Sequence, residues 1–170
     1  GLPPGWLNVV TCSGRVANHL VEHPDVAMIS FTGSPTVGWG IRGAVPQKRV
    51  GLELGNNAPA IVEPSADLEV VASKVAAGGY SFAGQSCISV QRVYAHRSVH
   101  DELATRLAAA VAELTVGDPL DPDTRVSALI RHAERERVEG WIDEAVDEGA
   151  EILTGGTRTE DGVLVPTLLG

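Results

Sequence analysis

Short apolar runs alternate with helical segments in the first part of this chain, and this alternation constrains the fold more than any other feature. The runs at 28–32, 49–54, 59–62 and 88–95 have the length and composition of buried strands. Helix-length segments over 35–44 and 66–81 follow the first and the third run. Strand, helix and strand in succession are typical of parallel strands joined by a crossover helix. The sequence therefore predicts an α/β fold of parallel sheets with crossover helices.

Capping and turn residues bound the remaining elements. Further helices are expected over 13–23, 98–114 and 133–148, and further strands at 6–10, 151–154 and 163–168. The expected helix N-caps are Ser13, Ser34, Ser65 and Ser98. Apolar residues at helical spacing are expected to face the core: Leu68, Val71, Ala72 and Val75, then Leu103, Leu107, Val111 and Leu114, and last Val138, Ile142 and Ala145.

The acidic composition narrows the choice of partners. A formal net charge of -9 would be repelled by nucleic-acid phosphates and by anionic membrane surfaces, so a small-molecule substrate is the better expectation. Only Cys12 and Cys87 occur, which indicates a reducing, cytoplasmic setting. No apolar stretch approaches the roughly 20 residues of a membrane span, and no His or Cys has zinc-like spacing. Neither end resembles a natural terminus, so we expect the chain to belong to a longer one.

The segment Phe31-Thr32-Gly33-Ser34 joins an expected strand to the start of an expected helix. Such a junction presents free backbone N–H groups and the positive end of a helix dipole, which together can bind a phosphate. An ordinary strand-to-helix turn with Ser34 as N-cap explains the same residues. The segment matches neither GxGxxG nor a Walker loop, so both interpretations stay open.

The segment Leu52-Glu53-Leu54-Gly55 places a carboxylate between two leucines near the end of an apolar strand. A partly apolar setting would suit Glu53 to take a proton from water. The alternative is a glutamate that points outward from an edge strand. Glu53 gains a catalytic meaning only beside a nucleophile.

The segment Gly84-Gln85-Ser86-Cys87 consists of small and polar residues that predict a tight turn. A cysteine on such a turn is open to a substrate, whereas a buried, unreactive thiol is the usual alternative. Cys12 directly precedes a helix and is interpreted as structural. No histidine lies in a segment suited to act as the base of a cysteine protease or acyltransferase, although the sequence leaves that site open.

In their order, these segments resemble the aldehyde dehydrogenase superfamily over essentially the whole chain. The stretches similar to its motifs are Gly1–Val10, His23–Ser34, Leu52–Gly55, Phe82–Cys87 and Val116–Pro119. The resemblance implies that residues 1–54 are the last part of a dinucleotide-binding, Rossmann-like domain and that residues 55–170 are the first part of a catalytic domain. It also implies a homo-oligomer.

The resemblance assigns the cofactor contacts for NAD or NADP. Gly33 and Ser34 would contact the pyrophosphate, and Val37 would lie near the adenine. Thr32 and Leu54 would lie near the nicotinamide.

The resemblance also assigns the chemistry. Cys87 would attack an aldehyde to give a thiohemiacetal, and hydride transfer to the cofactor would leave a thioester. Glu53 would activate the water that hydrolyses this thioester to a carboxylic acid. Asn56-Asn57 follows Gly55 where many members of the family have a second glycine and then lysine or asparagine, and this departure would alter the backbone near the nicotinamide. The upstream oxyanion-hole asparagine falls outside the chain, so the 170 residues alone are expected to be inactive.

Two alternative functions stay open. A CoA-acylating semialdehyde dehydrogenase would release the acyl group to CoA, but the presence of Glu53 favours hydrolysis. A non-catalytic binding or structural piece is the other alternative, and its open strand edges would favour self-association.

Overall fold

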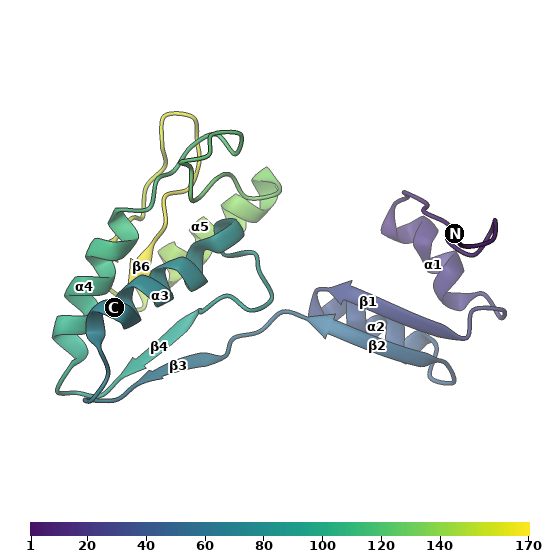
Figure 1. The fold of residues 1–170 in the computed structure, drawn as a ribbon, viewed down its shortest axis with the longest axis horizontal. Coiled ribbons are helices and arrows are strands. Elements are labelled where there is room, and N and C mark those ends of the chain that lie inside the picture. Colours follow the sequence, from purple (N-terminus) through teal and green to yellow (C-terminus); the bar gives the residue numbers. More distant parts are fainter. The chain divides into compact units, whose positions relative to one another are not determined.

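The structure is a computed structural model that describes residues 1–170, and the chain divides into two compact units, Gly1–Gly55 and Asn56–Gly170 (Figure 1). Each unit contains two parallel strands joined by a crossover helix, so the expected α/β class is confirmed. Among the helices there is none with the length and apolar character that crossing a membrane requires.

The N-terminal unit is built around one strand–helix–strand motif. Its elements are α1 (Gly14–Glu22), β1 (Met28–Gly33), α2 (Pro35–Ala44) and β2 (Arg49–Leu54). β1 and β2 pair in parallel along their whole length. Because Gly38 has no side chain, α2 lies close to this sheet: a Cβ there would be 2.7 Å from Leu54 Cδ2 and 3.3 Å from Phe31 Cδ1.

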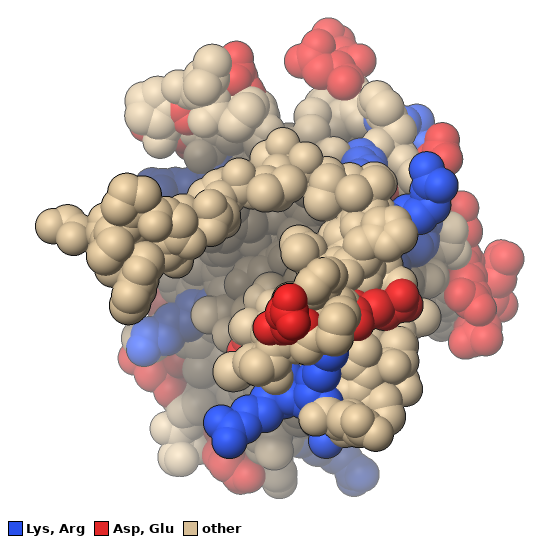
Figure 2. All heavy atoms as spheres, turned by 90° about the vertical axis from the view of Figure 1, so that its right-hand side faces the viewer, with Lys and Arg blue, Asp and Glu red and all other residues tan.

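The expected strand at 6–10 is wrong. Turns occupy residues 4–7, and Trp6 and Val9 are 73% and 86% exposed. An apolar run forms a strand only where its backbone N–H and C=O groups find a partner strand. The sheet of this unit contains only β1 and β2 and offers none. Figure 2 shows broad uncharged areas, in tan, between the charged side chains on the side of the molecule that it presents.

The C-terminal unit holds the remaining elements. These are β3 (Pro59–Val62), α3 (Leu68–Tyr80), the short 3₁₀ helix η1 (Ser81–Gly84), β4 (Arg92–Ala95), α4 (His100–Ala112), α5 (His132–Asp147), β5 (Ile152–Thr154) and β6 (Leu168–Leu169). β3 and β4 are parallel, with Pro59 opposite Arg92, whereas β5 and β6 are antiparallel. The expected strand over 163–168 is reduced to β6, because the residues before it make only an isolated bridge between Arg158 and Leu164.

The core of this unit lies between α3 and α4. Ala72 and Ala76 of α3 are buried against Leu107 and Val111 of α4, and the small alanine side chains let the two helices approach closely. The expected stripe on α4 is confirmed, with Leu103, Leu107 and Val111 buried and Leu114 half-buried. The other expected core residues are half-buried: Leu68, Val71, Val75, Val138, Ile142 and Ala145.

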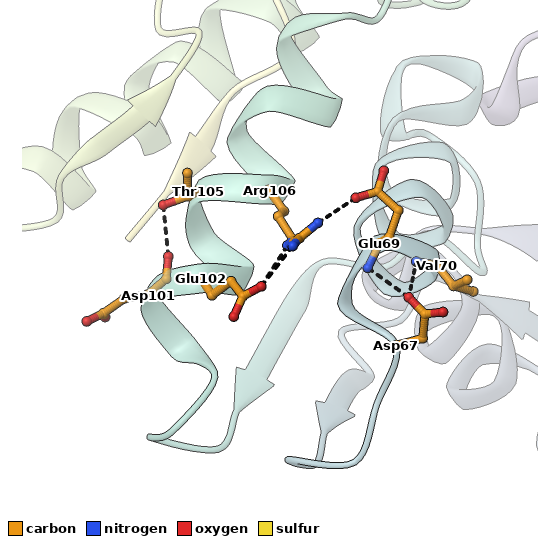
Figure 3. A network of polar contacts seen from close by, with 7 residues as sticks. All are labelled: Asp67, Glu69, Val70, Asp101, Glu102, Thr105 and Arg106. Carbon is orange, nitrogen blue, oxygen red and sulfur yellow. Dashed lines mark hydrogen bonds and ion pairs between the residues drawn. The ribbon is translucent and has the colours of Figure 1, made fainter.

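Two of the expected N-caps are wrong. α3 is capped by Asp67, whose Oδ1 accepts hydrogen bonds from the N–H groups of Glu69 and Val70 at 3.1 and 3.2 Å (Figure 3). A carboxylate two residues after Ser65 is the better acceptor at the positive end of the helix. Ser98 does not cap α4, because its hydroxyl bonds to His96 Nδ1 at 2.9 Å.

Arg106 links α3 and α4 at their exposed edge (Figure 3). Its Nη1 lies 2.7 Å from Glu69 Oε2, and its Nη2 lies 2.9 Å from Glu102 Oε1. The hydrogen bonds that Arg106 donates to Glu102 and, to a smaller extent, to Glu69 raise the pKa of Arg106 above its usual value. Only the Glu69 contact joins the two helices, because Glu102 lies one turn before Arg106 in α4, and an exposed ion pair of this kind contributes little to stability.

Candidate active site

All but one of the candidate residues lie in the N-terminal unit, at the carboxyl ends of β1 and β2. Thr32 pairs with Glu53 and Gly33 pairs with Leu54 across the two strands. Ligands of parallel α/β sheets bind at this edge. Since paired residues on parallel strands present their side chains to the same face, Thr32 and Glu53 lie side by side on the face opposite α2.

Ser34 caps α2 as expected. Its backbone is extended, with φ −69° and ψ 148°, and its Oγ accepts a hydrogen bond from the Val37 N–H at 3.4 Å. Pro35 is the first residue of the helix. The Ser34 hydroxyl proton and the first-turn N–H groups that α2 leaves unpaired remain free to donate to an anion. This end of α2 therefore has the donors that a phosphate requires.

Gly33 keeps the junction between β1 and α2 open. A Cβ at this position would lie 2.5 Å from the ring of Phe31. A larger residue would push the Phe31 ring aside. The glycine thus leaves the backbone accessible where the strand ends.

Glu53 is exposed, so the partly apolar setting expected for it is wrong. The Cδ2 atoms of Leu52 and Leu54 approach Gly38 and so face α2. Side chains alternate along a strand, which turns Glu53 to the opposite, open face. Its carboxylate is therefore open to water.

Cys87 lies on a turn, as expected. The turn runs from Ser86 to Ser89 and is closed by a hydrogen bond from the Ser89 N–H to the Ser86 carbonyl at 3.1 Å. The thiol is exposed, so the alternative of a buried cysteine is wrong. Cys12 is exposed as well, so exposure alone does not distinguish the two thiols.

The expected strand over 88–95 begins only at Arg92. Ile88 belongs to the Cys87 turn, and the Val90 N–H donates to the carbonyl of Gly78 in α3 at 3.2 Å. Between the turn and β4, the backbone is therefore hydrogen-bonded to α3 and does not pair with a strand.

The chain enters the Cys87 turn through a left-handed backbone. Phe82 and Ala83 have φ of 53° and 55°, and Gly84 continues with φ of 72°. Left-handed conformations cost non-glycine residues about 1–2 kcal/mol each. The surrounding contacts must offset this cost.

Gln85 provides two of these contacts. Its Nε2 donates to the Phe82 carbonyl at 3.1 Å, and its Oε1 accepts from the Ile130 N–H at 3.1 Å. Sequence reasoning missed this role, because nothing near Gln85 in the sequence indicates a partner at Ile130.

Tyr80 anchors the end of α3 that leads into the turn. Its hydroxyl donates to the Thr167 carbonyl at 2.6 Å. Burial of the side chain raises the pKa of Tyr80 to about 12. The segment before β6 thereby holds the last turn of α3 in place.

Asn56 and Asn57 contact the Cys87 turn and β4. The Asn56 Nδ2 donates to the carbonyl oxygen of Cys87, and the Asn56 Oδ1 accepts from the Ala58 N–H at 2.7 Å. Arg92 donates to the Asn57 carbonyl from Nε at 3.0 Å and from Nη2 at 2.6 Å. Asn56, which stands where the resemblance implies a second glycine, thus contacts the Cys87 turn through its side chain, whereas Asn57 contacts β4 through its backbone carbonyl only.

Comparison with known proteins gives consistent matches. The model of the Aldehyde dehydrogenase family matches residues 1–170. The chain is 46% identical to 3-sulfolactaldehyde dehydrogenase of Priestia aryabhattai, over 99% of this chain and 35% of that protein. The chain thus spans about a third of the length of this relative.

Two crystal structures are also similar. NAD-dependent aldehyde dehydrogenase from Sinorhizobium meliloti is 38% identical with a TM-score of 0.95, over 99% of this chain and 35% of that chain. NADP-dependent glyceraldehyde-3-phosphate dehydrogenase from Bacillus halodurans C-125, solved with NADP, is 40% identical with a TM-score of 0.88, over 94% of this chain and 33% of that chain.

Proposed function

This chain belongs to the aldehyde dehydrogenase family, and from that premise we propose that it forms part of an enzyme that oxidises an aldehyde to a carboxylic acid with NAD or NADP. The observation that carries the proposal is the exposed thiol of Cys87 on a hydrogen-bonded turn, in a chain that the family model matches throughout. Two of its relatives carry the name of their aldehyde substrate: 3-sulfolactaldehyde dehydrogenase and glyceraldehyde-3-phosphate dehydrogenase.

The residues at the ends of β1 and β2 fit a dinucleotide. The Ser34 hydroxyl and the start of α2 would hold the pyrophosphate, and Gly33 lets the phosphates approach the backbone. Val37 is 51% exposed and offers apolar surface to the adenine. Thr32 and Leu54 would flank the nicotinamide. When bound, the cofactor supplies the acceptor for the hydride that leaves the substrate carbon.

Cys87 carries out the first covalent step. Its thiolate attacks the carbonyl carbon of the aldehyde and forms a thiohemiacetal, whose negative oxygen requires hydrogen-bond donors. The backbone N–H of Cys87 has no acceptor within the chain and is available for this purpose. Collapse of the oxyanion expels hydride and leaves a thioester on the sulfur. A thioester is more easily hydrolysed than the ester that a serine would give.

Glu53 completes the cycle as the general base. It takes a proton from water, the hydroxide oxygen adds to the thioester carbon, and Cys87 leaves as thiolate with release of the acid. Only Leu54 and Gly55 separate Glu53 from Asn56, which contacts Cys87.

Substitution of the two catalytic residues tests the function in a protein of the relatives' full length that carries these residues. Cys87→Ala is expected to lower NAD(P)-dependent aldehyde oxidation to roughly a thousandth or less. Glu53→Gln is expected to retain the first burst of reduced cofactor but to stall at the thioester, because deacylation lacks its base. Cys12→Ala is the matched control and should keep full activity.

The assignment is wrong if Cys87→Ala oxidises aldehydes normally. Product analysis with CoA present separates the two modes of release. Free acid supports hydrolysis through Glu53, and acyl-CoA would identify a CoA-acylating enzyme.

The surroundings of the enzyme follow from the same residues. Both cysteines are exposed and form no disulfide, which fits a reducing cytoplasm. The net charge of -9 fits a small-molecule substrate and disfavours nucleic acid or an anionic membrane surface. We further propose a homo-oligomer, which sedimentation of the full-length protein would test.

A further inference from the structure

The segments that lead into β3 and β4 enter their small sheet at the same edge. The two strands are parallel, and Pro59 at the start of β3 lies opposite Arg92 at the start of β4. Asn56 comes shortly before Pro59, and Cys87 comes shortly before Arg92. The parallel pairing therefore brings the segment of Asn56 beside the turn that carries Cys87.

The Asn56 side chain is fixed at both of its polar atoms. Its Oδ1 accepts the Ala58 N–H at 2.7 Å, which leaves its Nδ2 directed at the Cys87 carbonyl, where it donates a hydrogen bond. The backbone next to it is held by the guanidinium of Arg92 on the Asn57 carbonyl. Asn56 is half-buried, whereas the Asn57 side chain is exposed and makes no hydrogen bond. Only the first of the two asparagines reaches the turn through its side chain.

The carbonyl that Asn56 holds belongs to the peptide that follows Cys87. Holding this peptide plane restrains the ψ dihedral at Cys87, and with it the direction of the Cα–Cβ bond, which carries the sulfur, relative to that plane. Other contacts hold the turn elsewhere: the Ser86–Ser89 bond, the Ile88 N–H on the Ser86 Oγ, the Gln85 bonds on its far side and, just beyond it, the Val90 N–H on the Gly78 carbonyl. At the entry to the turn, Phe82 and Ala83 have strained left-handed backbones, which would move to more favourable dihedrals if the turn were released. No other group donates to the Cys87 carbonyl, so without Asn56 the peptide that follows Cys87 is not held through its oxygen.

We propose that Asn56 is a positioning residue that sets the direction of the Cys87 sulfur through the Cys87 carbonyl. The inference rests on the proposed function, because the direction of the sulfur affects a rate only if the thiolate attacks a bound aldehyde. Such attack is sensitive to small displacements of the nucleophile. Asn56 touches neither substrate nor cofactor in this role.

A matched pair of substitutions tests the proposal in the full-length, cofactor-loaded enzyme. Asn56→Asp keeps an acceptor for the Ala58 N–H but removes the donor to Cys87, and Asn57→Asp adds the same charge one residue away. The measurement is the rate of the first burst of reduced cofactor, normalised to the number of reactive thiols, together with KM for the cofactor. Asn56→Asp should lower the burst rate about tenfold, with KM changed less than about twofold. Asn57→Asp should change neither quantity.

Asn56→Gly separates positioning from charge. It removes the donor without adding a carboxylate, and it should lower the burst rate per thiol by a similar factor. A purely structural role for Asn56 would lower the number of reactive thiols and leave the rate per thiol unchanged, and that result would overturn the proposal. Equal burst rates for Asn56→Asp and Asn57→Asp would overturn it as well. If the unsubstituted enzyme shows no aldehyde-dependent burst, the proposed function itself fails, and the positioning role fails with it.

Discussion

Replacing Tyr80 should make the stability of the C-terminal unit less sensitive to pH in the alkaline range. In the unsubstituted protein the Tyr80 side chain is half-buried, and its hydroxyl donates to the Thr167 carbonyl. Burial raises its pKa from the ordinary 10.0 to about 12, because an ionised phenolate would lose its hydration. Tyr80→Phe removes this titration and also leaves the Thr167 carbonyl without its donor.

The magnitude follows from the two pKa values. The raised pKa of Tyr80 means that the folded state holds the phenolic proton more tightly than the unfolded state does. The stabilisation is therefore fully present below about pH 10 and is lost as the pH rises from about 10 to about 12. The loss amounts to about 3 kcal/mol over this window, at about 1.4 kcal/mol for each unit of pKa difference. At neutral pH, Tyr80→Phe should cost about 1–3 kcal/mol through the unpaired carbonyl.

Urea unfolding at a series of pH values measures both effects. The free energy of unfolding should fall steeply above about pH 10 in the parent protein and less steeply in Tyr80→Phe. The chain contains two tyrosines, so ultraviolet titration of tyrosinate in a Tyr94→Phe background reports Tyr80 alone. Parallel loss of stability in the parent and in Tyr80→Phe would refute the reasoning. So would ionisation of Tyr80 with a midpoint near its ordinary value.

Two further predictions concern the backbone at Ala83 and at Gly38. Ala83→Gly should raise the free energy of unfolding by about 1 kcal/mol, since glycine removes the left-handed strain at this position, whereas Ala109→Gly within α4 should lower it by about as much. Chemical denaturation of the two variants checks the opposite signs, and equal signs would contradict the strain. Gly38→Ala should destabilise the N-terminal unit by about 1–3 kcal/mol, because its Cβ would lie 2.7 Å from Leu54 Cδ2. Gly40→Ala on the same helix meets nothing within 4 Å and should be neutral or stabilising, so similar thermal shifts for both variants would contradict the close packing of α2.

The elements that sequence reasoning located correctly are those with local causes. β2 and β3 have the expected bounds, and α2 begins at Pro35 after its cap Ser34. The buried stripe of α4 also follows from helical spacing alone. In each case the residues that specify the element are close together in the sequence, so side-chain periodicity and capping are enough to predict it.

The errors arose where a local pattern needed a distant partner. The apolar run at 6–10 has the composition of a strand, but no strand of its unit pairs with it. The apolar setting of Glu53 is expected from its neighbours Leu52 and Leu54, but these two side chains face α2 and Glu53 faces the opposite, open side. The expected cap of α3 is Ser65, but the helix begins only at Leu68, where Asp67 accepts the free N–H groups.

The sequence by itself determined the order of strands and helices, the turn that carries Cys87, and the family to which these residues belong, because short-range preferences and motif spacing are written along the chain. Only the tertiary structure decided how that turn is held. Its contacts join residues 31 positions apart for Asn56 and Cys87, 45 for Gln85 and Ile130, and 87 for Tyr80 and Thr167. Such pairs form when parallel strands and packed helices bring remote segments together, and neither propensity nor periodicity specifies which side chains will then meet.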